Sequence, residues 1–317
     1  MLFGRDKSQD GKTVLILDIE NGSVGAALLR FSQDKAPEFL GSWREHLPVR
    51  ATRDAESLAD STQKIIKDLM PAISLEATLL RQGFEGHKGG VSTIAAFLSP
   101  PWGKPNLETG KPDFVPHLQD VLKHETSPYF EVPINFYTSA GAAAQGLRVL
   151  SPYEDKYLIC IVTHETTELL LIYNGQVAGH ASLPHGLNLP LRTLKTHSGM
   201  SDAEARSLLR LGSYAGQALP AITSATEHYA DEFKSAAREL FDAYVPEQVW
   251  VVSPAGEYFA HALSHPSLNE LFPQGGAVRA LKPRHLEQHL PAQAGLPGSA
   301  NKDLFLILEA LYLRYTQ

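Results

Sequence analysis

Hydrophobic positions near the start of the chain form two apolar runs separated by a short polar stretch. The first run covers residues 13–17 and ends at Asp18, and the second covers residues 23–31. The polar stretch contains Asn21 and Gly22, and Asn-Gly is a strong hairpin signal because both residues tolerate positive φ. The pattern therefore predicts two antiparallel strands, with Asp18 at the mouth of the turn that joins them.

A similar pattern returns in the middle of the chain. Residues 157–163 form an apolar run, a polar stretch of Thr, His and Glu follows, and a second apolar run leads to Asn174 and Gly175. Two strand–turn–strand units so far apart predict a duplicated fold. In such a fold the two polar turns face each other across a shared cleft.

Apolar periodicity along the rest of the chain predicts an α/β protein. Strands are expected at 13–19, 23–31, 38–47, 91–98, 132–137, 157–163, 167–174, 176–183, 248–253 and 277–281. Helices are expected at 55–70, 114–124, 138–147, 220–243, 257–263 and 284–289, and from residue 301 or 302 to 315. Pro71 is expected to end the first helix, and Ser201 and Glu204 form a capping box that begins another. Each half then has the order β-β-β-α-β-α-β-α.

These elements divide the chain into an arm, two domains and a closing helix. We expect a flexible arm at 1–11, a first domain at 12–150, a second domain at 151–300 and the closing helix at 301–317. The second domain is expected to carry a helical subdomain over residues 188–245.

The composition is that of an ordinary globular protein and narrows the range of partners. Of the 317 residues, 43% are hydrophobic and 20% are charged, and the net charge of −7 comes without clusters of Lys and Arg. Nucleic acid is therefore not an expected partner. The one cysteine, Cys160, lies inside an apolar run and is interpreted as a buried small hydrophobe, compatible with a reducing cytoplasm. With no apolar run as long as a membrane span and no secretory pattern in residues 1–7, we expect a cytoplasmic location.

Few residues carry obvious chemistry. Asp18 has two interpretations, a carboxylate that holds a hydrated metal ion beside a phosphate-binding turn, or a turn residue that accepts backbone N–H bonds. His164, His180 and His185 lie close in sequence, but their spacing matches no zinc-binding pattern. The chain has no P-loop, no GxGxxG loop and no Gly-x-Ser-x-Gly elbow, which excludes those three classes of site.

The duplicated order resembles the actin-like ATPase superfamily, and within it the bacterial branch that includes the cell-division protein FtsA and the type IV pilus assembly protein PilM. The resemblance covers most of the chain and implies two ribonuclease H-like domains that flank an interdomain cleft. Residues 18–23 resemble the first phosphate motif, residues 161–168 the second, residues 249–256 the adenosine motif, and residues 135–146 the small-residue linker helix. This branch carries an extra domain inserted in the first half. The stretch between Leu98 and Val132 is too short for it, so we expect that domain to be reduced or absent.

The resemblance implies that ATP and Mg²⁺ bind in the cleft, with Asp18 as the metal ligand. The nucleotide-binding residues that it implies are Asp18, Asn21, Gly22, Ser23, Glu165, Thr166, Thr167 and Gly256. Judged from the residues alone, Thr166 and Thr167 are also ordinary β-branched strand residues.

The same motifs depart from the family pattern at several positions. Ile161 stands where the second phosphate motif has aspartate. Thr163 and His164 stand at its glycine positions, where a side chain obstructs the approach of a phosphate to backbone N–H groups. Pro254 removes a donor from the adenosine loop.

Two functions are compatible with this pattern. The first is a non-catalytic or weakly catalytic actin-fold scaffold of bacterial cell division or type IV pilus assembly at the inner membrane face. Its expected partners are proteins, including a membrane-anchored assembly protein and further copies of itself. The second is an active Mg-ATP-dependent ATPase or small-molecule kinase, in which Asp18 holds Mg²⁺ and Glu20 or Glu165 positions the attacking group.

Overall fold

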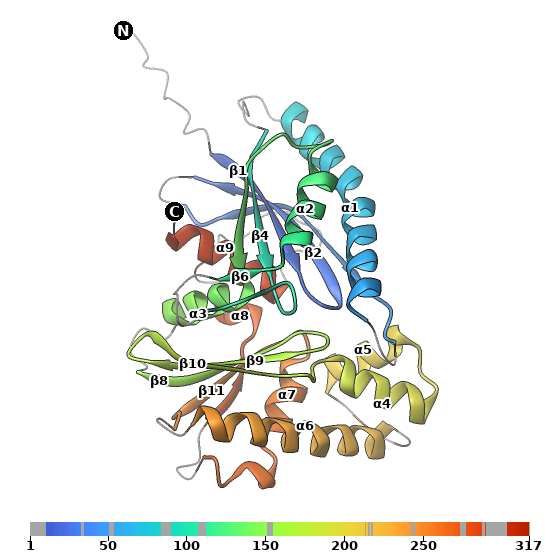
Figure 1. Cartoon of the computed structure of the whole chain (residues 1–317), viewed down its shortest axis with the longest axis vertical. Helices are drawn as coiled ribbons and strands as arrows, with labels where there is room; N and C mark the ends of the chain where they lie inside the picture. The colour runs from blue at the N-terminus through green and yellow to red at the C-terminus, as the bar shows by residue number, and fades with distance from the viewer. Residues whose placement is uncertain are drawn as a thin grey trace.

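The chain folds into two five-stranded sheets of the same topology (Figure 1). The computed structural model describes residues 11–32, 35–50, 54–83, 90–106, 112–150, 155–212, 214, 216, 218–241, 245–272, 277–286, 289 and 303–316. The first sheet has the order β3-β2-β1-β4-β7 and the second has the order β10-β9-β8-β11-β12. In both, an antiparallel meander of three strands is extended by two parallel strands. The expected duplication is therefore confirmed.

The strands and helices have the following bounds. The first sheet contains β1 (Lys12–Ile19), β2 (Ser23–Phe31), β3 (Glu38–His46), β4 (Val91–Leu98) and β7 (Ile134–Thr138). The second contains β8 (Lys156–Val162), β9 (Thr167–Tyr173), β10 (Gln176–Leu183), β11 (Gln248–Val252) and β12 (Ala277–Ala280). A small hairpin consists of β5 (Gly103–Lys104) and β6 (Asp113–Phe114). The helices are α1 (Ala55–Gly83), α2 (Pro116–Thr126), α3 (Ser139–Leu150), α4 (Asn188–Ser198), α5 (Asp202–Leu211), α6 (Ala218–Leu240), α7 (Gly256–Leu263), α8 (Pro283–Leu286) and α9 (Leu304–Thr316), with a 3₁₀ turn at Pro266–Leu268.

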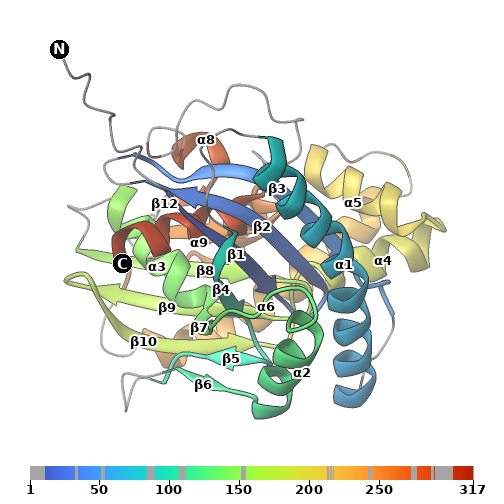
Figure 2. The ribbon, with the colours of Figure 1, turned by 90° about the horizontal axis from the view of Figure 1, so that it is seen from above.

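The two sheets are separated by a middle layer of helices and covered by helices on their outer faces. Helices α3 and α9 pack between the sheets and share one apolar core with both of them. Helices α1 and α2 cover the outer face of the first sheet, and Figure 2 shows α1 lying along it. Helices α4, α6 and α7 cover the outer face of the second sheet (Figure 1).

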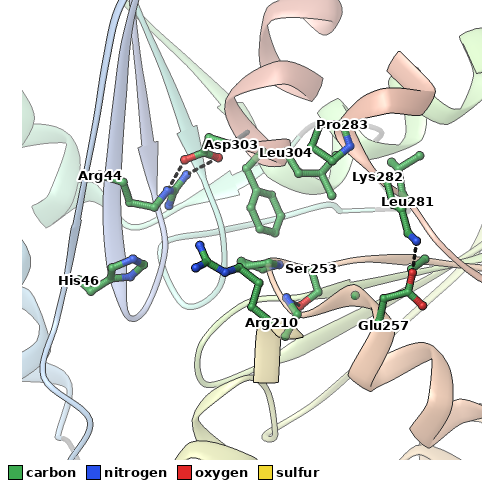
Figure 3. Close-up of a pocket in the computed structure, with 15 residues that line it drawn as sticks. Arg44, His46, Arg210, Ser253, Glu257, Leu281, Lys282, Pro283, Asp303 and Leu304 are labelled. Atoms are coloured by element: carbon green, nitrogen blue, oxygen red, sulfur yellow. Dashed lines mark hydrogen bonds and ion pairs between the residues drawn. The ribbon is translucent and has the colours of Figure 1, made fainter. Parts of the chain in front are cut away.

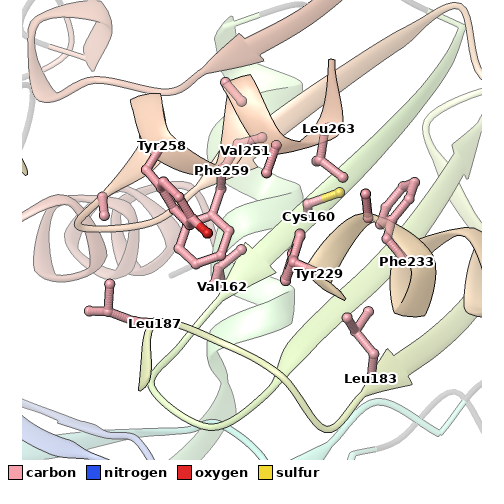
Figure 4. Packing of buried hydrophobic residues seen from close by; sticks show 14 of the residues in the cluster. Cys160, Val162, Leu183, Leu187, Tyr229, Phe233, Val251, Tyr258, Phe259 and Leu263 are labelled. Carbon is pink, nitrogen blue, oxygen red and sulfur yellow. The ribbon is translucent and has the colours of Figure 1, made fainter. Parts of the chain in front are cut away.

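Alternation along β1 and β8 decides which side chains enter the middle layer. On β1, Val14 and Ile16 face that layer, and Asp18 continues the same face. On β8, Ile159 and Ile161 face it, whereas Cys160 points into the outer core of the second sheet (Figure 4). Cys160 is fully buried, as expected, and burial raises the pKa of its thiol well above the ordinary value.

The two polar turns occupy equivalent places in the duplicated fold. In the turn between β1 and β2, the backbone N–H of Glu20 donates to the backbone oxygen of Ser23 at 3.0 Å. In the turn between β8 and β9, the backbone N–H of Thr163 donates to the backbone oxygen of Thr166, also at 3.0 Å. These two bonds make Glu20 equivalent to Thr163. The next residue of each turn is then Asn21 or His164, and the residue two positions earlier is Asp18 or Ile161. The alignment that puts Ile161 in the aspartate position thus agrees with the structure.

The two Asn-Gly pairs adopt different backbone conformations. Asn174 and Gly175 have φ values of 50° and 70°, as a two-residue hairpin turn with two left-handed residues requires. Asn21 and Gly22 are not in the left-handed region, so the conformational reason predicted for that turn is wrong. Glycine is needed at position 22 for space, because a Cβ there would lie 2.2 Å from the Cβ of His164.

The expected end of the first helix at Pro71 is also wrong, because α1 runs through it to Gly83. A proline inside a helix costs about 3 kcal/mol through one lost hydrogen bond and a steric clash. Ile66, Met70 and Ile73 are fully buried on either side of Pro71 and belong to one apolar core. Burial of this continuous stripe offsets the local cost.

The remaining expected strands and helices are present, and the ends that the structure describes are shifted by a few residues. Residues 242–243, 287–288 and 301–302, at the ends of three expected helices, lie outside the described residues. The capping box is present as predicted at the start of α5, between Ser201 and Glu204. Most of the expected arm, residues 1–10, lies outside the described residues, as do 151–154 and 290–302. Within the described part of the chain, no helix is both long enough and apolar enough to cross a membrane.

Candidate functional site

The two duplicated turns touch each other directly through the side chain of Asn21. Its Nδ2 donates to the hydroxyl of Thr166 at 3.0 Å and to the carbonyl of Pro100 at 3.0 Å. Its Oδ1 accepts from the backbone N–H of Glu165 at 2.9 Å and from the hydroxyl of Thr163 at 3.4 Å. Asn21 is buried, so these bonds satisfy both ends of its amide and join the halves at the centre of the cleft.

His164 makes the return contact, from the second turn into the first. It is buried against Gly22, and its Nδ1 lies 2.9 Å from Oε2 of Glu20. Its Nε2 lies 3.1 Å from Nη1 of Arg206, which can only donate. Nε2 therefore accepts from Arg206, which leaves Nδ1 as the ring nitrogen that carries the proton and donates to Glu20. His46 completes the contact, with its Nδ1 3.3 Å from the same Nε2.

Arg44 reaches Asp18 along one row of the first sheet. Asp18 is paired with Gly25 between β1 and β2, and Gly25 is paired with Arg44 between β2 and β3. A Cβ on Gly25 would lie 2.6 Å from Nη2 of Arg44. The missing side chain therefore lets the arginine extend across β2 and form an ion pair with Oδ2 of Asp18.

The same guanidinium binds four partners. Besides Asp18, its Nη1 donates to Ser23 at 2.7 Å and to Glu20 at 3.2 Å. Its Nε and Nη2 donate to the two carboxylate oxygens of Asp303 at 2.5 and 3.1 Å. Asp303 lies just before α9, and its Oδ1 accepts from the backbone N–H of Leu306 at 3.3 Å. Arg44 thus ties the first turn to the start of the helix that fills the middle layer.

The carboxylates around Arg44 outnumber it, and burial raises the pKa of two of them, Asp18 and Glu20. Burial raises the pKa of Asp18 to about 7 and that of Glu20 to about 7, although Arg44 acts in the opposite direction on both. Glu309, on α9, is fully buried, and burial raises its pKa well above the ordinary value, with the Asp18 charge adding to the effect. Oδ1 of Asp18 and both carboxyl oxygens of Glu309 are buried with no donor among the described residues. A proton held between these two carboxyl groups would supply the donor that their oxygens lack.

The other expected site residues lie around this junction with different partners. Oε1 of Glu165 accepts from Asn188 at 2.7 Å, and both of its carboxylate oxygens accept from Arg192 at 2.7 Å. The hydroxyl of Thr167 donates to the carbonyl oxygen of His185 at 2.7 Å and lies 3.1 Å from the Tyr229 hydroxyl. Thr167 is therefore engaged in the outer layer of the second sheet.

A cavity of about 460 Å³ lies beside the junction, between the two halves (Figure 3). One wall is the loop Ser253–Gly256 after β11, and the opposite wall comes from Arg44, Asp303 and the start of α9. Lys282 and Glu257 form an ion pair at one end, as Figure 3 shows. Of the residues expected to bind nucleotide, Gly256 lines this cavity, while Asn21, Gly22 and Ser23 are buried in the junction.

This arrangement does not fit the triphosphate and metal end of Mg-ATP. Mg²⁺ binds through carboxylates and retained water molecules, but Asp18 is fully buried and its Oδ2 is paired with Arg44. The space where phosphates would meet the turns holds the Asn21 amide and the His164 ring. The adenosine end differs, because the cavity along Ser253–Gly256 is of a size that accepts a small molecule.

Sequence reasoning did not find Arg44, Asp303 or Glu309, which define the charge of the site. Arg44 lies on a strand that alternates weakly, and Glu309 lies in an otherwise apolar helix. The only sequence signal for this part of the site is Glu309, a charged residue within the apolar segment 304–313, because a glutamate in such a segment needs a polar group beside it. The pairing of Arg44 with Asp18 depends on a strand register that includes a bulge between Leu28 and Leu29.

Comparison with known proteins shows the fold but no close relative. No protein-family model matches the sequence, and no curated protein matches it. Among solved structures, the type IV pilus biogenesis complex of PilM with PilN is similar at 13% identity and a TM-score of 0.61, over 96% of this chain and 98% of that one. The ethanolamine utilization protein EutJ from Carboxydothermus hydrogenoformans is similar at 14% identity and a TM-score of 0.52, over 83% and 88% of the two chains. The chain therefore has the actin-like ATPase fold that its sequence resembles.

Proposed function

We propose that this chain is a non-catalytic actin-fold scaffold for the assembly of a type IV pilus or a related bacterial machine. The observation that carries the proposal is the direct contact of the two turns through Asn21 and His164. In an actin-like ATPase the corresponding turns hold the nucleotide phosphates between them. Here protein side chains join the halves, so the closed arrangement forms without a nucleotide.

The charges at the junction support the same proposal. Arg44 supplies the positive charge that a metal ion would bring to Asp18, and it adds bonds to Glu20 and Asp303 that hold α9. Ile161 puts an apolar side chain where the second turn would need its own carboxylate. Hydrolysis requires a carboxylate that is free to orient water, and Glu20 and Glu165 are both bound to arginines.

The likeness to PilM gives the proposal its partner. The similar structure is a complex of PilM with PilN, and the match extends over almost the whole of both chains. We propose that a protein of the corresponding assembly binds this chain at the inner membrane face, from the cytoplasmic side. Copurification of the chain with a membrane-anchored assembly protein of its own organism tests this part.

A nucleotide titration tests the central part. We expect a fluorescent ATP analogue to bind no more tightly with Mg²⁺ than without it, and we expect no phosphate release. Asp18→Ala should leave that result unchanged, with Asp113→Ala on the β5–β6 hairpin as a control carboxylate. Magnesium-dependent binding that is lost in Asp18→Ala but kept in Asp113→Ala would overturn the proposal.

The cavity beside Gly256 favours the alternative of an ATP-dependent enzyme, since it retains room for a nucleoside. In that case the junction would have to open so that Asp18 exchanges Arg44 for Mg²⁺. Competition separates the two functions. If the cavity binds only a nucleoside, adenosine displaces the analogue as well as ATP does; if the phosphates are bound too, Mg-ATP is the much better competitor.

A further inference from the structure

Three metal-binding side chains meet on the outer surface of the second half. His185 comes from the connection between β10 and α4, and His228 and Glu232 lie one turn apart on α6. One ligand atom from each of the three lies within 4.8 Å of the others. The rings of His185 and His228 have centroids 4.8 Å apart, and Nε2 of His185 lies 4.0 Å from Oε2 of Glu232.

Buried groups beneath the cluster fix the two elements that carry it. Thr167 donates to the backbone oxygen of His185 at 2.7 Å, and its hydroxyl lies 3.1 Å from that of Tyr229, the residue after His228. Thr167 and Tyr229 are fully buried. The backbones of the connection and of α6 are therefore held at a fixed separation, while the side chains above them remain partly exposed.

We propose that His185, His228 and Glu232 bind a divalent transition-metal ion, with Zn²⁺ as the best match. Two imidazoles and one carboxylate are a ligand set that zinc accepts, whereas Mg²⁺ and Ca²⁺ prefer oxygen ligands alone. Three protein ligands leave at least one position for water. The site is separate from the junction and does not depend on whether the chain binds nucleotide.

Small side-chain rotations bring the ligands to coordination distance. Zinc bonds of about 2.1 Å in a tetrahedral arrangement place ligand atoms about 3.4 Å apart. Glu232 is 42% exposed and His228 is exposed, so both can turn toward His185 without disturbing the core. The nearby Arg192 is paired with Glu165, which reduces its repulsion of an incoming cation.

A metal ion here would fasten α6 to the segment that supports the second turn. Directly after His185, Gly186 packs so closely that a Cβ would lie 2.4 Å from the carbonyl oxygen of Thr163. Leu187 donates its N–H to that oxygen at 2.8 Å, and Asn188 donates to the carbonyl oxygen of His164 at 2.7 Å. Metal binding should therefore slow hydrogen exchange in residues 163–188 as well as in α6.

The test uses full-length protein without an affinity tag, stripped with a chelator and titrated with ZnCl₂. We expect one zinc ion per chain with micromolar or tighter affinity, and a rise in Tm of about 3–5 °C when free zinc is a hundred times its dissociation constant. His228→Ala and Glu232→Gln should each weaken binding at least tenfold. His261→Ala, at an exposed position on α7, is the matched control and should bind zinc like the wild type.

Cobalt reports the ligand type independently of affinity. Co²⁺ at this site should give visible bands of nitrogen and oxygen coordination, with no thiolate band, because Cys160 is buried elsewhere. Zinc binding with unchanged affinity in both His228→Ala and Glu232→Gln, or no binding at 100 μM zinc by wild-type protein, would overturn the proposal. Since both substitutions lie on the helix surface, circular dichroism of the metal-free variants verifies that they fold.

Discussion

Asn21 and His164 occupy equivalent positions of the two duplicated turns, and each side chain reaches across into the other turn. Asn21 bonds to Thr166 and to the N–H of Glu165, while His164 bonds to Glu20 and packs on Gly22. The two contacts are reciprocal but chemically different, since one half contributes an amide and the other an imidazole. Under the proposed function, this contact takes the place of the phosphates that bridge the corresponding turns of an actin-like ATPase.

Removing the amide should loosen the junction. Asn21→Ala leaves the buried N–H of Glu165 without an acceptor, and we expect it to lower the free energy of unfolding by about 2–3 kcal/mol. Urea unfolding measures this loss, and hydrogen exchange should accelerate at residues 163–166. The partly exposed Asn106, whose Nδ2 donates to Asp113 at 3.0 Å, is a control whose replacement by Ala should cost less than about 0.5 kcal/mol. Equal effects at the two positions would contradict a specific role for Asn21.

Adding a methyl group at Gly22 should force the two turns apart. The new Cβ would lie 2.2 Å from that of His164, so we expect Gly22→Ala to cost about 1–3 kcal/mol. His164→Gly in the same chain should recover part of this loss, although it is destabilising alone. Gly175→Ala is a control with nothing within 4 Å and φ of +70°, where only the left-handed backbone is penalised. The Gly175→Ala loss should not change when His164→Gly is added.

Arg44 should be among the costliest residues to replace. Arg44→Met leaves Asp18, Glu20 and Asp303 without their shared cation, and we expect a loss of about 3–5 kcal/mol. Adding Asp18→Asn should restore part of that loss, because it removes one of the uncompensated charges. The surface pair of Arg30 and Glu38, at 3.2 Å, is the control, and Arg30→Met should cost less than about 1 kcal/mol. The four proteins form a double-mutant cycle. If Asp18→Asn changes the free energy of unfolding by the same amount with Arg44 as with Met at position 44, the proposed pairing is contradicted.

Stability should depend on pH through the buried carboxyls. Burial raises the pKa of Asp18 from 3.8 to about 7, so the folded state binds this proton more tightly than the unfolded state. The resulting stability is fully present below pH 3.8 and is lost as the pH rises to about 7. Glu20 acts in the same direction, whereas His46, whose pKa is lowered by burial from 6.5 to about 3, removes stability as the pH falls.

The difference in the free energy of unfolding between the wild type and Asp18→Asn isolates the contribution of Asp18. Urea unfolding at a series of pH values measures this difference. The stability of the wild type relative to the variant should decrease as the pH rises from about 4 through 7, and should level off about one unit above 7. The effect of His46 is shared by both proteins and cancels. A difference that is flat over this range, or that increases with pH, would show that Asp18 is ionised in the folded protein at all these values.

The sequence predicts the fold well because local signals determine it. Apolar alternation, the capping box at Ser201 and the repeated polar turns specify the strands and helices, and their order specifies two copies of one topology. Pro71 shows where local reasoning fails, because burial on both sides of it outweighs the cost of the proline.

The candidate site is less predictable, because its partners meet only in three dimensions. Arg44 reaches Asp18 across Gly25, in a strand pairing whose register shifts between Leu28 and Leu29. Asp303 and Glu309 come from a segment far away in the sequence. Alignment of the two polar turns with the phosphate motifs located Asp18, Asn21 and the residues from Glu165 to Thr167. The alignment could not show that side chains of one turn would bond directly to the other turn.

The position of α9 has a consequence for synthesis of the chain. This helix fills the space between the sheets, yet among the described elements it is the last to leave the ribosome. Until residues 304–316 emerge, the inner faces of both sheets lack part of their cover, and Arg44 lacks Asp303. The nascent chain should therefore stay open at its centre, and exposed to chaperones, until α9 arrives.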